Sequence, residues 1–226
     1  MIPAARPLRI VGDVHGDARA LGYAVSTDRF VIQLGDIADG APGTAPDNPG
    51  AWRLMLDVLE AGRGLFVLGN HDRKLGRALA GKAVRRDAAL DATIDSLDDV
   101  LRPRVLEAIR TAPAWLRRGA RFFVHGGFHP EMLHAASPPG LGRVTPVLAR
   151  ALFGQTTGLA QADGYPQRVL DWVDAIPTSL AVYCGHDRRS TDGRPVRMTG
   201  RAGGTVLFLD TGAGKGGHLS WVDLPA

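Results

Sequence analysis

The chain has 226 residues, of which 45% are hydrophobic and 22% are charged. These values fit one sizeable globular domain, since a chain of this length buries a full core without disulfides. The single cysteine, Cys184, excludes an intrachain disulfide, and no stretch approaches the ~18 apolar residues of a membrane span. Residues 1–13 show no apolar leader, so we expect a cytoplasmic protein.

The formal net charge is +4, which favours anionic partners. The basic residues are scattered, and no long basic run or aromatic-basic alternation is visible. We therefore expect neither a membrane partner nor a stable nucleic-acid partner.

Six short apolar runs predict buried strands, because their apolar residues are continuous rather than alternating. They cover residues 8–11, 30–34, 65–68, 121–124, 179–184 and 205–209. A helix is predicted over 48–62, where four apolar residues share one face and a glycine follows: Trp52, Met55, Leu56, Leu59 and Gly62. A second helix is predicted over 165–176, with Pro166 in its first turn.

The longest stretch without a predicted strand runs from about 74 to 114. Its helical patterns predict a cap or side lobe, whereas the segments 40–50 and 137–142 are rich in proline and glycine and predict loops. We expect an α/β fold with a single domain over 1–226 and a helical, cap-like insertion at about 74–114.

Polar residues follow the predicted strands where each one ends. In chain order these segments read GDVHG (12–16), GDIADG (35–40), GNHD (69–72), HGG (125–127), GHD (185–187) and DTG (210–212). Glycines let the backbone turn sharply and approach a site closely. The carboxyl ends of strands are where α/β folds gather ligand-binding groups.

Aspartate, histidine and asparagine without thiolate form a ligand set suited to Mn, Fe, Co, Ni or Zn. One aspartate can bridge two ions, and two divalent ions about 3.5–4 Å apart are a common clamp for phosphoester hydrolysis. The sequence therefore indicates a metal site that acts on phosphate.

In this order the motifs resemble those of the calcineurin-like metallophosphoesterases, most closely the phosphoprotein-phosphatase branch. Segments 163–189 and 209–225 are similar to the phosphatase module of bacterial polynucleotide kinase-phosphatases and to symmetrical diadenosine tetraphosphatases. The resemblance implies the metallophosphoesterase four-layer sandwich, in which two mixed β-sheets are flanked by helices.

The resemblance also implies a role for each motif residue. Two divalent ions, most simply Mn with Fe, Zn, Co or Ni as alternatives, would be held by six ligands: Asp13 and His15 on the first ion, Asp36 bridging both, and Asn70, His125 and His186 on the second. A metal-bridged hydroxide would attack phosphorus. His71 would act as general acid, oriented by Asp39, although these two could instead form a structural hydrogen-bonded pair.

One departure from the family concerns phosphate binding. The phosphatase branch carries an arginine in GDxxDRG, and Gly40 stands at that position here. Arg168 matches an arginine that precedes the GH motif and is the best substitute, followed by Arg73 and then Arg188. Each of these arginines could equally be a solvated surface residue.

The expected function is hydrolysis of phosphoester or phosphoanhydride bonds in nucleotides, nucleic-acid ends or small phosphorylated molecules. Two alternatives stay open: a protein serine/threonine phosphatase, and a catalytically weak or inactive scaffold of the same fold, for which the change at Gly40 is the only support. Asp210 either orients a ligand histidine or caps a turn.

Overall fold

The computed structural model describes residues 2–3, 5–41, 43–162 and 164–226. Its first sheet has the strand order β11-β1-β2-β3. The inner strands β1 (Leu8–Val11), β2 (Phe30–Gln33) and β3 (Gly64–Phe66) run parallel, and β11 (Trp221–Leu224) joins β1 antiparallel at the edge. The apolar runs that predicted these three parallel strands are therefore confirmed, within two residues at each end.

The second sheet has the order β4-β5-β8-β10-β9. Its three central strands are parallel and its two edge strands are antiparallel. The strands are β4 (Trp115–Arg118), β5 (Arg121–Val124), β8 (Ala181–Cys184), β9 (Val196–Thr199) and β10 (Thr205–Phe208). The sequence did not predict β4, β9 or β11, because these edge strands mix charged with apolar residues.

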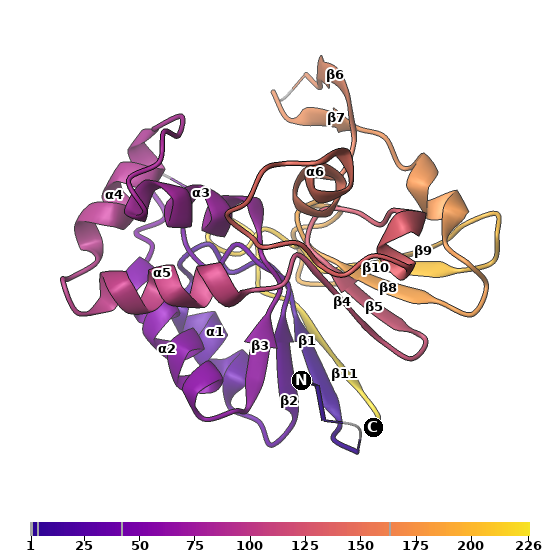
Figure 1. Ribbon diagram of the computed structural model, residues 1–226, viewed down its shortest axis with the longest axis horizontal. Helices are drawn as coiled ribbons and strands as arrows, with labels where there is room; N and C mark the ends of the chain where they lie inside the picture. The colour runs from indigo at the N-terminus through magenta and orange to yellow at the C-terminus, as the bar shows by residue number, and fades with distance from the viewer. Residues whose placement is uncertain (1, 4, 42, 163) are drawn as a thin grey trace.

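The two sheets face each other across an apolar layer (Figure 1). Leu8 and Ile10 of β1 belong to the same buried cluster as Phe123 of β5 and Tyr183 of β8, whose rings stack with centroids 5.5 Å apart. Because side chains alternate along a strand, Val11 belongs instead to the cluster that includes the helices. The expected architecture of two mixed sheets flanked by helices is confirmed.

Helices α1 (Ala18–Val25) and α2 (Asn48–Glu60) cover the first sheet, and α6 (Pro146–Phe153) lies beside the second (Figure 1). The predicted helix over 48–62 is confirmed, with Asp47 as its N-cap accepting from the Gly50 amide at 2.8 Å. Among the described residues, none of the helices is both long and apolar enough to cross a membrane.

The segment 74–114 contains most of α3 (Asn70–Leu79) together with α4 (Ala88–Ser96) and α5 (Leu101–Thr111). Helix α5 packs on α2 and α3, and α4 packs on α2, where Asn48 donates to Thr93 Oγ1 at 3.0 Å. The helices themselves agree with the sequence pattern, whereas a cap-like role for them stays a prediction.

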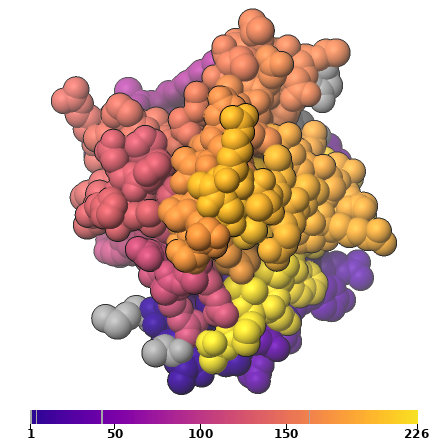
Figure 2. Space-filling model, turned by 90° about the vertical axis from the view of Figure 1, so that its right-hand side faces the viewer, coloured from indigo at the N-terminus to yellow at the C-terminus, as the bar shows by residue number. Residues whose placement is uncertain are grey.

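The single helix predicted over 165–176 is wrong. Residues Pro166–Arg168 form strand β7, which pairs with β6 (Thr156–Ala160) in a hairpin set apart from both sheets, and Asp171–Ala175 form a short 3₁₀ helix (Figure 1). Only Trp172 and Val173 of this 3₁₀ helix are buried, and one turn is enough to bury them. Figure 2 shows the face of the molecule formed by this C-terminal half, with the chain from about residue 150 onward in orange to yellow.

Candidate metal centre

All six expected ligands lie just beyond the carboxyl ends of strands from both sheets. Their atoms fall into two groups, each with ligand atoms within 4.8 Å of one another: Asp13, His15 and Asp36 in one, and Asp36, His125 and His186 in the other. Asp36 belongs to both groups, as a bridging ligand must. Asn70, the first residue of α3, places its Oδ1 2.9 Å from His125 Nε2.

Two histidines present a ring nitrogen toward the carboxylates. His125 Nδ1 donates to the Leu34 carbonyl at 2.8 Å, which leaves Nε2 available 3.3 Å from Asp36 Oδ2. His15 Nε2 is buried, lies 3.8 Å from Asp13 Oδ2 and from Asp36 Oδ2, and has no hydrogen-bond partner. A histidine whose Nδ1 is held by a backbone carbonyl, and whose Nε2 lies among carboxylates, has the arrangement usual for a metal-ligating histidine.

The electrostatics of the cluster also fit a bound cation. Burial by itself would lower the pKa of His125, but the carboxylates of Asp36 and Asp13 raise it to about 10. Burial, followed by the ammonium group of Lys215, lowers the pKa of His15 well below its ordinary value. Without a metal ion, His125 therefore holds a proton that balances the carboxylates, and ligation would release it.

Backbone strain is concentrated at this cluster. Among the described non-glycine residues, five have positive φ, and four of them are site residues: His15 (47°), Asp36 (58°), Asp39 (74°) and His186 (62°). Such conformations cost about 1–3 kcal/mol each and persist where the surroundings enforce them. The turns also approach closely, because a Cβ on Gly69 would lie 2.2 Å from Asp36 Oδ1.

The proposed acid pair lies next to the metal cluster. His71 Nδ1 is hydrogen-bonded to Asp39 Oδ2, and the His71 amide donates to Asp36 Oδ1 at 2.9 Å. Burial alone would lower the pKa of His71, but the charge of Asp36 and the hydrogen bond to Asp39 raise it above its ordinary value. The raised pKa favours the protonated ring, which is the form that a general acid requires.

Two positioning residues were not predicted from the sequence. Asp72 is buried and accepts hydrogen bonds from the amides of Asp36 (2.7 Å), Ile37 (3.0 Å) and Gly69 (3.0 Å), so it holds the turn that carries the shared aspartate. Burial and the nearby Asp36 charge raise the pKa of Asp72 to about 6. The position of Asp72 directly after the GNH motif could have identified it from the sequence.

Asn48 is the other positioning residue, because its Oδ1 accepts from the Asp39 amide at 3.1 Å. No motif marks Asn48, which reaches the site only through the fold. Asp210 accepts from the Gly212 amide at 2.9 Å and therefore caps a turn, and its charge, after burial itself, also raises the pKa of Asp13. The turn-capping role expected for Asp210 is therefore observed, whereas a role in orienting a ligand histidine stays a prediction.

Two of the three arginines considered for phosphate binding, Arg73 and Arg168, have different surroundings in the structure. Arg73 is buried, and its Nε and terminal nitrogen donate to the carbonyls of Gly140 (3.0 Å) and Gly142 (2.9 Å), so this guanidinium anchors the loop 137–142. Arg168 lies near the cluster, since its positive charge is among the causes, after burial and His125, that lower the pKa of His186.

No side chain fits at Gly40. A Cβ there would lie 2.4 Å from the His15 carbonyl oxygen and 2.7 Å from Pro46 Cβ. The loop 212–217 covers this region: the Gly214 carbonyl accepts from the Ala41 amide at 3.0 Å and from Thr44 Oγ1 at 2.9 Å. The glycine is therefore part of a tightly packed turn.

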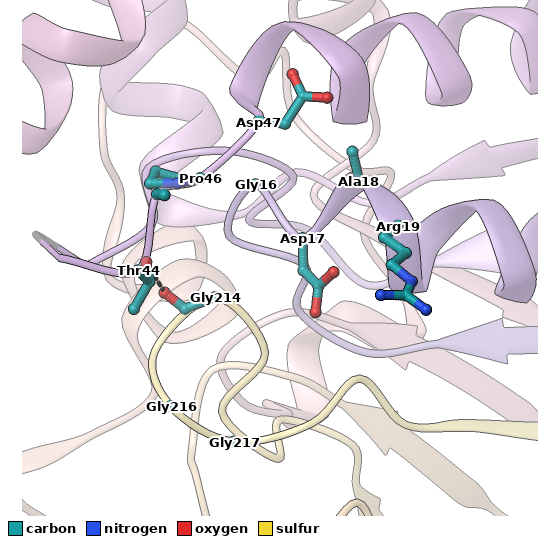
Figure 3. Close-up of a pocket in the computed structure, with 11 residues that line it drawn as sticks. Gly16, Asp17, Ala18, Arg19, Thr44, Pro46, Asp47, Gly214, Gly216 and Gly217 are labelled. Carbon is teal, nitrogen blue, oxygen red and sulfur yellow. Dashed lines mark hydrogen bonds between the residues drawn. The ribbon is translucent and has the colours of Figure 1, made fainter.

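A cavity of about 350 Å³ opens beside the same turn. Asp17 and Arg19 line it at the start of α1, Asp47 at the start of α2, and Gly214 from the loop opposite (Figure 3). Asp17 and Asp47 are the N-caps of these two helices, so their carboxylates already accept backbone amides.

Two facing mixed sheets, with buried aspartate, histidine and asparagine side chains gathered at their strand ends, define the class of metal-dependent phosphoesterases. The chain belongs to the calcineurin-like phosphoesterase family, whose model matches residues 7–187. The protein is therefore a hydrolase that acts on phosphoester bonds.

Curated relatives span nearly the same length. The chain is 25% identical over 240 residues to the bis(5'-nucleosyl)-tetraphosphatase PrpE (asymmetrical) of Bacillus subtilis, covering 96% of this chain and 90% of the relative. The enzyme of the same name from Bacillus velezensis is 26% identical over 239 residues, covering 96% of this chain and 88% of the relative.

Solved structures share the fold. The crystal structure of a candidate diadenosine tetraphosphatase superposes with a TM-score of 0.63 at 18% identity, covering 100% of this chain and 96% of the other. A protein serine/threonine phosphatase from Saccharomyces cerevisiae gives a TM-score of 0.58 at 13% identity, covering 99% of this chain and 81% of the other.

Proposed function

We propose that this protein hydrolyses phosphoanhydride bonds of nucleotides, with bis(5'-nucleosyl) tetraphosphates as the first substrates to test. The observation that carries the proposal is the pair of ligand groups that share Asp36, with the His71–Asp39 pair directly beside them. The relatives named as tetraphosphatases support the choice of substrate, because they match over almost the whole chain.

The six gathered side chains are proposed to hold two divalent ions, with manganese as the first metal to test. When bound, such ions neutralise phosphate charge and make a water molecule nucleophilic near neutral pH. Asp36 would fix the spacing of the two sites, and Asp13 with His15 and His125 with His186 would complete them. Asp72 would keep the shared carboxylate in place through its three amide hydrogen bonds.

His71 is proposed to donate its ring proton to the leaving oxygen. The Asp39 carboxylate accepts from Nδ1, which leaves the opposite ring nitrogen, Nε2, to face the substrate. Arg168 is proposed to bind phosphate oxygens, whereas Arg73 is committed to the loop carbonyls of Gly140 and Gly142. A cytoplasmic location is also proposed, which the free and buried thiol of Cys184 fits.

The test compares substrates on protein that has been stripped of metal and reloaded with Mn²⁺. The substrates are p-nitrophenyl phosphate, bis-p-nitrophenyl phosphate, diadenosine tetraphosphate and a phosphoserine peptide. We expect manganese-dependent turnover with the highest kcat/KM on the tetraphosphate. Chromatography of the products then identifies the bond cleaved, since AMP with ATP and two ADP molecules are distinct outcomes.

Two results would overturn the proposal. A higher kcat/KM on the phosphoserine peptide would favour the protein phosphatase alternative. Full metal loading without turnover of any of the four substrates would favour the inactive scaffold, for which Gly40 in place of the family's arginine is the supporting observation.

A further inference from the structure

A second cavity, also of about 350 Å³, lies between the β6–β7 hairpin and the segment that follows His186. Tyr165 and Arg168 line it from the hairpin, and Arg188 and Arg189 line it from the opposite side. The Tyr165 hydroxyl donates to the His186 carbonyl at 3.1 Å. Because His186 is one of the six gathered ligands, this cavity adjoins the metal centre. We call it the basic cavity.

Two cations of the basic cavity stack on one aromatic ring. The guanidinium carbon of Arg168 is 5.3 Å from the centroid of the Tyr165 ring, and that of Arg188 is 5.5 Å from it. A tyrosine ring attracts cations through its π face, so Tyr165 brings two positive charges to one ring. Bringing like charges together is unfavourable, and such an arrangement is typical of a site for an anion.

The carboxylate in the cavity does not offset these two charges. Asp187 is buried and pairs with Arg189, whose terminal nitrogen is 2.5 Å from Asp187 Oδ2. One terminal nitrogen of Arg168 donates to the Phe153 carbonyl at 2.9 Å and the other to the Tyr165 hydroxyl at 3.4 Å, while its Nε is buried without a hydrogen-bond partner. The cavity is therefore lined by two guanidinium groups that stack on one ring, and its one carboxylate is already paired with Arg189.

We propose that the basic cavity binds the part of the substrate's phosphate chain that extends beyond the phosphate being cleaved, and that Arg188 is the residue that selects polyphosphate over monophosphate substrates. This inference rests on the proposed function, because it assumes a nucleoside polyphosphate. A guanidinium group binds two phosphate oxygens at once, and a chain of phosphates offers one group to each arginine. Tyr165 is a positioning residue that keeps both guanidinium groups in place.

The first test measures binding alone. Isothermal titration calorimetry of inorganic tripolyphosphate into metal-free protein, at constant ionic strength, measures the affinity for the phosphate chain. Neither turnover nor metal chelation then contributes to the signal. We expect Arg188→Gln to weaken binding about tenfold, the loss of one charged hydrogen-bonding group. Arg194→Gln is the matched control, since it removes the same charge from a side chain that is 88% exposed.

Arg188→Lys extends this test because it keeps the charge and removes the planar fork. We expect its affinity for tripolyphosphate to lie between those of wild type and Arg188→Gln. Circular dichroism and thermal unfolding would verify that all three variants fold. Equal affinities for Arg188→Gln and Arg194→Gln would overturn the inference.

The second test uses kinetics of the metal-loaded enzyme. We compare kcat/KM on diadenosine tetraphosphate with kcat/KM on p-nitrophenyl phosphate. In Arg188→Gln we expect the ratio of the two to fall about tenfold because KM for the tetraphosphate rises. In Arg194→Gln the ratio should stay as in wild type. An unchanged ratio in Arg188→Gln would contradict the role of Arg188. If wild type does not hydrolyse the tetraphosphate, the proposed function fails, and tripolyphosphate binding still decides whether the cavity is an anion site.

Discussion

The metal centre and the basic cavity adjoin each other but are built in different ways. Asp13, His15 and His125 are almost completely buried and follow directly on strands of the two packed sheets. The basic cavity takes Tyr165 and Arg168 from a hairpin whose strand β6 is exposed along its whole length. Under the functions proposed above, the reacting groups belong to the packed core, whereas substrate choice belongs to a surface hairpin that can change without disturbing the sheets. Substitutions in the two regions should therefore have different signatures.

The largest effect is expected for Asp36→Ala, because Asp36 belongs to both ligand groups. Turnover should fall on the order of 10³-fold or more on every substrate, and the metal content measured by mass spectrometry should fall with it. Asp57→Ala, at an exposed position on α2, is the control. A variant that still binds two ions and turns over normally would remove Asp36 from the mechanism.

His71→Ala should lower kcat on diadenosine tetraphosphate by roughly 10²–10⁴-fold, the usual contribution of a positioned acid. The loss on p-nitrophenyl phosphate should be much smaller, since p-nitrophenolate leaves without needing a proton. Metal content should not change, and the exposed His134→Ala serves as control. An equal loss on both substrates would argue against an acid role and for a structural pair with Asp39.

Gly40→Arg tests whether the missing arginine can be restored. We expect it to lower the free energy of unfolding by about 1–3 kcal/mol in urea titrations, because even the Cβ would lie 2.4 Å from the His15 carbonyl oxygen. Gly40→Ala should show most of the same loss. A stable Gly40→Arg variant with improved KM for p-nitrophenyl phosphate would show instead that the turn can open.

The smallest effect is expected for Asp39→Asn in the metal-free protein. The hydrogen bond to Asp39 is one cause of the raised pKa of His71. The pKa of His71, measured by NMR of its imidazole ring, should therefore be lower in the variant than in wild type. A raised pKa means that the acid form persists to higher pH, so kcat of the metal-loaded variant should begin to fall with rising pH earlier than kcat of the metal-loaded wild type. Asp95→Asn, at an exposed position, is the control. An unchanged pKa of His71 in Asp39→Asn would contradict the hydrogen bond between His71 and Asp39.

The sequence by itself determined the chemistry-bearing part of this protein. Six continuous apolar runs became the buried strands of both sheets, because such runs are stable only where both faces are covered. The polar motifs follow those apolar runs without a gap, so once the runs are known to be strands, the placement of Asp13, Asp36 and His125 at one end of the sheets follows. Family membership then agrees with the motifs, since the match covers residues 7–187.

Only the tertiary structure decided which basic and positioning residues reach the site. Arg73 stands next to motif residues in sequence, yet its partners are carbonyls 67 and 69 residues away. Arg168 was placed by a hairpin that the sequence presented as a helix, because a short apolar pattern fits both one 3₁₀ turn and an amphipathic helix. Contacts between distant segments also bring the Asn48 side chain to the Asp39 amide. They leave no space for a side chain at Gly40. Local patterns fix strands and their ends, whereas the partner of a long side chain depends on how separate segments pack.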